Sequence, residues 1–300
     1  MSAHKPLIES PSAPTASALQ SMMRYLFLPF MLIGINGIAI YLVGSGYDKW
    51  ILAPLLILAI FVAFAVERII PYRDCWNSSH GDITRDACHA FVNEGVNVAG
   101  LLMLPLVAQS LTVVQAWPSS LPFAIQIVIA LLVLDCGITL AHFASHKSRW
   151  LWRFHAVHHS VKRFYGFNGL MKHPIHQLIE TSAGAAPLLI IGVPSSVFTA
   201  VAFCVVVQLL LQHSNADYRT GIFKYILALN CVHRFHHLKW PGVGDVNFGL
   251  VTTLWDHLLG TFVFDPIREF NSEVLGIETW PSYPQEYIEQ LAAPFRPEFK

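Results

Sequence analysis

Several stretches of this chain are apolar over the length that a helix needs to cross a lipid bilayer. The first, Tyr25–Val43, contains 19 residues and no charged side chain. Others follow at Trp50–Val66, Val96–Trp117 and Leu121–Ala141, the last interrupted only by Asp135. About 20 apolar residues span the hydrocarbon core, and the backbone polar groups there must be satisfied within a helix. The pattern predicts an all-α, integral membrane helical bundle with about four spanning helices.

A fifth apolar stretch, Leu188–Gln212, is interrupted by Gly192, Val193 and Pro194. It is compatible with a re-entrant hairpin that turns at 192–196, because each arm is too short to span a bilayer comfortably. The four clearer stretches and this hairpin together define the expected bundle.

Charge is sparse and unevenly placed. Charged residues make up 13% of the chain, about half the share in an ordinary soluble domain. Lys and Arg are absent between Arg85 and Lys147 and again between Lys172 and Arg219. Because basic loops favour the cytoplasmic side, we expect the loops at 67–85 and 147–172 to face the cytoplasm.

The remaining composition excludes several classes of protein. The net charge is zero, so no basic surface for a nucleic-acid partner is expected. Five scattered cysteines without a C-x-x-C pair argue against a disulfide framework, a zinc knuckle and a thiol redox centre. We expect a disordered tail over 1–20, N-terminal transmembrane helices over 21–88, a catalytic domain over 89–265 and a cytoplasmic tail over 266–300.

Histidine carries the strongest functional signal. Of the 15 histidines, eight fall into one H-x-x-x-H group and two H-x-x-H-H groups, each of which shares one face if helical. The eight are His142, His146, His155, His158, His159, His233, His236 and His237. All three groups lie beside the basic loops, so the pattern predicts a histidine-rich cap that binds two metal ions on the cytoplasmic side.

Imidazole suits iron, zinc, copper and nickel, and eight imidazoles are too many for one ion. His173 and His213, at the ends of neighbouring segments, are candidates to complete the two ligand sets. His176 is interpreted as a neighbour of the site. Four unclustered histidines are interpreted as structural or surface residues: His4, His80, His89 and His257.

Asp135 lies in an apolar helix, where burying a carboxylate costs free energy. It is therefore a candidate for a functional role. It precedes His142 by seven residues and falls near the same helical face. We expect it to accept a hydrogen bond from an imidazole N–H of the metal site.

At this point the residues resemble the fatty acid hydroxylase superfamily, also called the sterol desaturase family. The order of the three histidine groups matches, as do Trp150–Ser160, His173-Pro174, His213-Ser214-Asn215 and the two segments Val246–Gly249 and Leu254–Phe262. His257 and Phe248 depart from the family, which usually has Arg and often Tyr at these places. The similarity covers about residues 60–265.

The resemblance implies a di-iron oxidoreductase that uses O2 to hydroxylate or desaturate a membrane-embedded lipid. The implied ligands are the eight histidines of the three groups, together with His173 and His213. The substrate could be a sterol, a fatty acyl chain, a carotenoid or an aminolipid. Because the chain has no haem, ferredoxin or dinucleotide motif, we expect a separate electron donor protein of the ferredoxin or cytochrome b5 type.

Other classes of protein remain open alternatives. A membrane zinc hydrolase would need a Glu beside its ligands, as in H-E-x-x-H, and none of the three groups contains one. A di-haem carrier would place single histidines mid-helix. A non-enzymatic metal transporter would need ligands near the middle of the bilayer, whereas these lie at one boundary.

Overall fold

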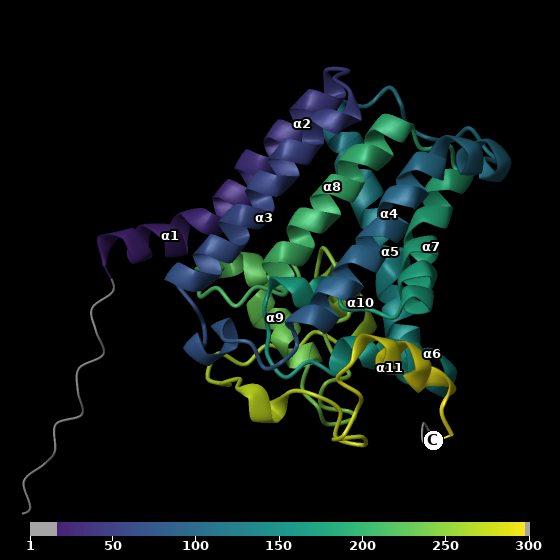
Figure 1. The fold of residues 1–300 in the computed structure, drawn as a ribbon. Helices are drawn as coiled ribbons and strands as arrows, with labels where there is room; N and C mark the ends of the chain where they lie inside the picture. Colours follow the sequence, from purple (N-terminus) through teal and green to yellow (C-terminus); the bar gives the residue numbers. More distant parts are fainter. Residues whose placement is uncertain (1–16, 298–300) are drawn as a thin grey trace, which may run out of the picture.

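The computed structural model describes residues 17–297, which form helices and loops without a strand. The long helices stand side by side as a bundle, and short helices and loops close one end of it (Figure 1). We call this end the cap. Its helices are α6 (Arg149–His159), α9 (Asn230–His236), α10 (Leu254–Leu259) and α11 (Tyr287–Ala292). The predicted all-α class is confirmed.

Within the described residues, four helical segments are long and apolar enough to cross a membrane, which is the number predicted, but the predicted span Val96–Trp117 is not one of them. The first is Ala18–Gly44, made of α1 (Ala18–Pro29), the π-helical turn η1 (Phe30–Ile35) and α2 (Asn36–Gly44). The second is Lys49–Ile69, which contains the short helix η2 (Lys49–Ile51) and α3 (Leu52–Ile69). The third and fourth are α5 (Phe123–Lys147) and α8 (Ser195–Gln212). Pro29, which has no backbone N–H to donate, is the last residue of α1, and the π-helical turn follows it directly.

Two apolar stretches fold differently from the expectation. The stretch from Val96 lies in α4 (Ile83–Leu111), which starts closer to the cap and ends before Trp117. The expected hairpin forms α7 (Pro174–Ile190) and α8, joined by a turn in which Gly192 has a φ of +79°. Its second arm, α8, is one of the four candidate spans.

The two ends of the chain can be compared with the expected tails only in part. Residues 1–16 lie outside the described residues. From Ser17 the chain is ordered, and Ser17 and Gln20 cap α1 by reciprocal side-chain hydrogen bonds. The segment after 265 folds back on the cap, where Gln290 contacts His89 and Ser160.

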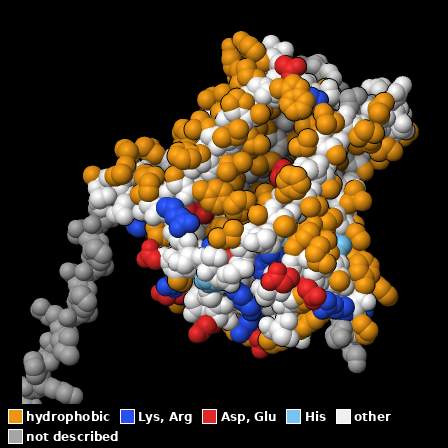
Figure 2. Space-filling view, in the orientation of Figure 1, with side chains coloured by type: hydrophobic (Ala, Val, Ile, Leu, Met, Phe, Trp, Pro, Cys, Tyr) orange, Lys and Arg blue, Asp and Glu red, His pale blue; other side chains and the backbone are white. Residues whose placement is uncertain are grey.

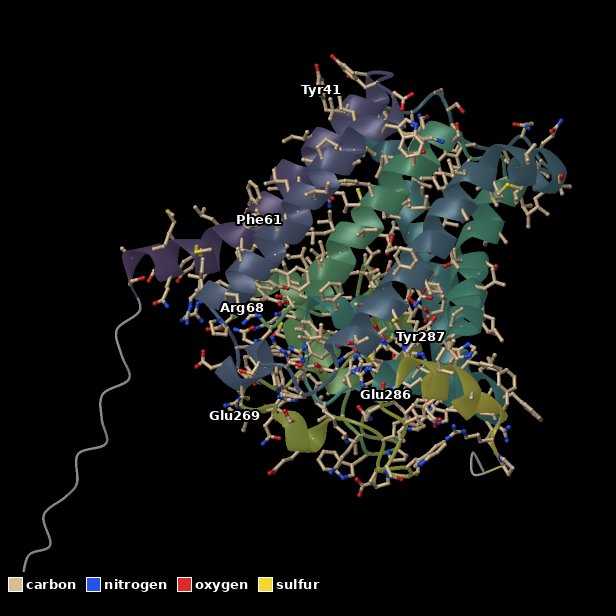
Figure 3. All side chains as sticks on the ribbon, viewed as in Figure 1. Tyr41, Phe61, Arg68, Glu269, Glu286 and Tyr287 are labelled. Atoms are coloured by element: carbon tan, nitrogen blue, oxygen red, sulfur yellow. The ribbon has the colours of Figure 1, made fainter. Side chains whose placement is uncertain are left out.

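Polar and apolar surfaces separate along the bundle axis. In Figure 2 hydrophobic side chains cover the bundle, whereas most charged side chains gather at the cap end. Figure 3 shows Phe61 pointing outward from α3 and Tyr41 at the far end, while Arg68, Glu269 and Glu286 lie toward the cap. Phe61 is 70% exposed, as expected of a side chain that faces lipid. The chain is an integral membrane protein.

Helices α5 and α7 meet at glycines, and this contact positions the functional residues. A Cβ atom on Gly137 would lie 2.1 Å from the Ala183 carbonyl oxygen, and one on Gly184 would lie 2.8 Å from Ile138. Small residues let two helix backbones approach closely in a membrane. The close crossing brings the polar ends of both helices together, since His142 lies five residues after Gly137.

Gly137→Ala should therefore destabilise the bundle, because the backbone of α7 cannot yield as a flexible side chain would. Overpacking of this kind costs about 1–3 kcal/mol. The check is the thermal unfolding midpoint of the purified chain in detergent. Gly100→Ala is the matched control, since a Cβ atom there meets nothing within 4 Å. Equal midpoints for the two variants would contradict the packing argument.

Candidate metal centre

The three predicted histidine groups come together inside the cap. His142 and His146 lie in the last two turns of α5, and α6 ends with His155, His158 and His159. α9 carries the third group, with His237 directly after its end. His213 follows the last residue of α8. Each group lies at the end of a helix, as the spacing predicts.

Among the described residues, nine imidazoles divide into two groups in which all candidate ligand atoms lie within 4.8 Å of one another. We call the first the five-histidine group: His142, His146, His155, His159 and His236. In it, the Nε2 atom of His142 lies 3.0 Å from that of His155 and 2.8 Å from that of His236. The Nε2 atoms of His146 and His159 are 3.2 Å apart.

The other four form the four-histidine group: His158, His213, His233 and His237. The Nε2 atom of His213 lies 3.4 Å from that of His158 and 3.1 Å from that of His233. The two groups adjoin, because the rings of His159 and His237 stack with their centroids 4.9 Å apart.

These spacings fit metal ligation. Donor nitrogens about 2.1 Å from one ion, at right angles to each other, lie about 3.0 Å apart. A neutral imidazole carries its proton on one nitrogen only. His142 and His236 use Nδ1 toward carbonyl oxygens, which can only accept. Their Nε2 lone pairs therefore face each other at 2.8 Å, an arrangement that a cation between them would relieve.

One short segment, 245–248, orients three imidazoles of the five-histidine group. The carboxylate of Asp245 lies 2.8 Å from Nδ1 of His146. The carbonyl oxygens of Val246 and Phe248 lie 2.9 Å from Nδ1 of His236 and His142, respectively. Such partners fix the proton on the outer nitrogen and leave Nε2 free to ligate. The hydrogen bond with His146 lowers the pKa of Asp245.

Two buried carboxylates hold this segment in place. Asp256 accepts hydrogen bonds from the backbone N–H groups of Phe248 and Gly249. Asp135 accepts three backbone N–H bonds, from residues 250–252, and one from the Thr252 hydroxyl. The expectation that Asp135 contacts an imidazole was wrong. Its oxygens bind the loop instead, so it acts on the histidines through the backbone.

His173 does not join either group. Its Nδ1 accepts a hydrogen bond from the Ile175 N–H and so caps α7, and its Nε2 lies 3.2 Å from the Leu291 carbonyl oxygen. Both ring nitrogens are thus committed to the backbone, which corrects its proposed role as a ligand. His213, the other uncertain candidate, does belong to a group.

The remaining histidines have structural contacts or lie outside the structure. His89 is buried between the Lys172 carbonyl oxygen and Gln290. His257 stacks on Phe262. His80 is exposed, and His4 lies outside the described residues.

A buried charged cluster adjoins the five-histidine group and was missed in the sequence. Glu180, His176 and His155 place their candidate donor atoms within 4.8 Å. Lys172 Nζ lies 2.5 Å from the Glu180 carboxylate, so an ammonium already balances that charge. His176 contacts Ser145 Oγ at 3.0 Å, in keeping with its interpretation as a neighbour. The spacing of His176 and Glu180, four apart, was the available signal.

A small, partly open cavity, about 10 Å³ in volume, lies between the two groups. Imidazoles from both groups line it, together with Lys172, Glu180 and Gln212 and the apolar side chains of Ile138 and Leu250. A space of this size holds about one water-sized molecule. The cavity therefore adjoins both candidate ion positions.

Burial keeps these imidazoles neutral. It lowers the pKa of seven of them, to about 3 for His213 and well below the usual value for His155, His158, His159, His233, His236 and His237. Neutral imidazole is the form that ligates metal, so the folded cap maintains its ligands in the competent state.

Comparison with known proteins agrees with this arrangement. Residues 127–261 match the model of the fatty acid hydroxylase family. The chain is 33% identical to an ornithine lipid hydroxylase of Rhizobium tropici, over 81% of this chain and 74% of that protein. It is 29% identical to an alkylglycerol monooxygenase of Danio rerio, over 45% of this chain and 30% of that protein.

A sphinganine C4-monooxygenase of Arabidopsis thaliana is 25% identical over 55% of this chain and 63% of that protein. No solved structure matches the chain.

Removing one imidazole from either group should lower the metal content of the purified chain. His158→Ala and His236→Ala each delete a donor, whereas His173→Ala deletes none. Elemental analysis of the three variants beside the unmodified chain is the measurement. Loss of metal from the His173 variant, or full metal content in the other two, would contradict the assignment.

The metal-free chain should lose stability as the pH falls below about 7. Burial holds the folded-state pKa values of these seven histidines below the unfolded value of about 6.5, so the unfolded chain takes up protons first and is favoured as the pH falls. Unfolding midpoints of chelator-treated protein between pH 8 and pH 5 give the measurement. A flat profile would show that these imidazoles are not buried as described.

Proposed function

The chain belongs to the fatty acid hydroxylase family, and from that premise we propose that its two histidine groups hold two iron ions for O2-dependent hydroxylation of a membrane lipid. The observation that carries the proposal is the convergence of nine buried, neutral imidazoles on two adjoining centres. The chain is an oxidoreductase, and zinc has no redox chemistry to offer. Imidazole suits iron equally well.

The residues divide the work in a simple way. When bound, the irons supply the activation of O2 for attack on an unactivated C–H bond. The chain's own side chains supply the ligands, and segment 245–248 orients three of them. Ile138 and Leu250 contribute apolar side chains to the lining of the cavity. Lys172 and Glu180 place a fixed pair of opposite charges at its edge.

The first candidate substrate is an aminolipid of the ornithine lipid type. The support is the relative whose name carries that substrate, matched over most of both chains. Alkylglycerol and sphinganine enzymes match over shorter stretches and at lower identity. Hydroxylation is favoured over desaturation because these relatives are named as hydroxylases or monooxygenases.

We place the active site on the cytoplasmic side and expect electrons from a separate ferredoxin or cytochrome b5 type protein. Most of the Lys and Arg residues lie toward the cap end (Figure 2). The loop at the far end between α2 and α3 has a single basic residue, Lys49. Basic loops favour the cytoplasm, where such donors would reach the charged surface of the cap.

Two alternatives find less support. A zinc hydrolase would need a carboxylate free to act as a base, but the carboxylate at the cavity, Glu180, is paired with Lys172. A transporter would distribute its ligands along a path through the membrane, whereas both groups lie at one end of the bundle.

Expression of the chain in a bacterial host that makes ornithine lipid should add a lipid species heavier by about 16 mass units, one oxygen atom. His236→Ala should abolish it because the five-histidine group loses a donor, and the His257→Ala control should retain it. Lipid mass spectrometry makes the measurement.

Other outcomes of that experiment discriminate the alternatives. A decrease of about two mass units would indicate desaturation. A product heavier by one oxygen atom in a lipid without an amine would show that the substrate is not an aminolipid. An unchanged lipid profile with iron-loaded protein and a competent donor would defeat the proposed function.

A further inference from the structure

We propose that the two histidine groups bind their ions with unequal affinity, and that the five-histidine group is the tighter site. This inference rests on the proposed function only in that both groups hold ions. Its basis is a difference between the groups in how the outer nitrogens of the imidazoles are held.

In the five-histidine group, three imidazoles have a hydrogen-bond acceptor at Nδ1. These are the carboxylate of Asp245 and the carbonyl oxygens of Val246 and Phe248, all at 2.8–2.9 Å. One continuous segment supplies all three, so the three rings are oriented as a unit. Orientation before binding removes the cost of ordering the ligands when the ion arrives.

The four-histidine group has much less of this support. His158 has the Met171 carbonyl oxygen 3.2 Å from Nδ1. The Nδ1 atoms of His213, His233 and His237 are buried and have no hydrogen-bond partner among the described residues, whereas in the five-histidine group the same holds for His155 alone. All three rings instead pack against the apolar ring of Phe164. Apolar packing restricts a ring without raising the basicity of its ligating nitrogen.

The orienting segment is itself anchored from two sides. Asp256 is 1% exposed and binds the backbone of Phe248 and Gly249, and Asp135 is fully buried and binds residues 250–252. Asp135 belongs to α5, the same helix as His142 and His146. The segment and two of the ligands it orients are therefore fixed to one rigid element.

The expected difference in metal affinity can be estimated from the effect of removing such hydrogen bonds in other metalloproteins. Removing a hydrogen-bond partner of a metal-bound imidazole typically costs 10–100-fold in metal affinity. The number of donors, five against four, acts in the same direction. We infer that an ion in the four-histidine group exchanges first.

The test is a chelator titration of the full-length chain in detergent, loaded with Fe(II) under anaerobic conditions. Two equal steps of iron release are expected, separated by about 10–100-fold in free chelator concentration. His237→Ala should remove only the weak step. Asp245→Ala should shift only the tight step, by about 10-fold toward weaker binding, and Asp245→Asn, which keeps an acceptor oxygen, should shift it less.

Asp265→Ala is the matched control, because Asp265 is an exposed aspartate whose contact is to the nearby Ile267 N–H. It should leave both steps unchanged. Release of both irons in one step, or a shift of the weak step by Asp245→Ala, would overturn this inference and leave the proposed function standing. A chain that binds no iron would overturn the proposed function itself.

Discussion

The structure depends on the close approach of imidazole lone pairs in the buried interior of the cap. Nε2 atoms from separate helices lie 2.8–3.4 Å apart, and burial disfavours the protonated ring that would turn such a contact into a hydrogen bond. Neutral, buried and crowded donors are stable together when a cation lies among them. The close crossing of α5 and α7, the helix-end placement of each group and the folded cap all serve this one requirement.

Segment 245–248, which follows α9, fixes the orientation of three of the candidate ligands. Its backbone carbonyl oxygens face the histidines, and the N–H groups of Phe248 and of the residues that follow it bind two aspartates. Asn247, whose φ is +53°, lies in the middle of this segment, and its side chain binds the backbone at Val232 and Val263. A left-handed backbone at a residue other than glycine is uncommon. Here it lets the flanking carbonyl oxygens of Val246 and Phe248 reach two different imidazoles.

Features that depend on local spacing could be predicted from the sequence. Histidines three or four apart share a helix face, so the groups at 142–146, 155–159 and 233–237 were recognisable, as were the apolar spans. Their division between two centres was not, because His158 and His159 are adjacent and project about 100° apart into different groups. The partners of Asp135 lie about 115 residues away in the chain. The contacts of His173 and the pairing of Glu180 with Lys172 likewise arise only from tertiary packing.

The order of the ligands along the chain has a consequence for biosynthesis. Five of the nine clustered imidazoles are complete once residue 159 has been made, but the aspartate that completes the hold on the orienting segment is residue 256. At about 5–20 residues per second, translation needs roughly 5–20 s to make the intervening chain. During that interval the nascent protein presents metal-binding side chains without the framework that directs them. Stable metal binding therefore requires that synthesis has proceeded beyond residue 256. A nascent chain halted before that point would bind metal weakly.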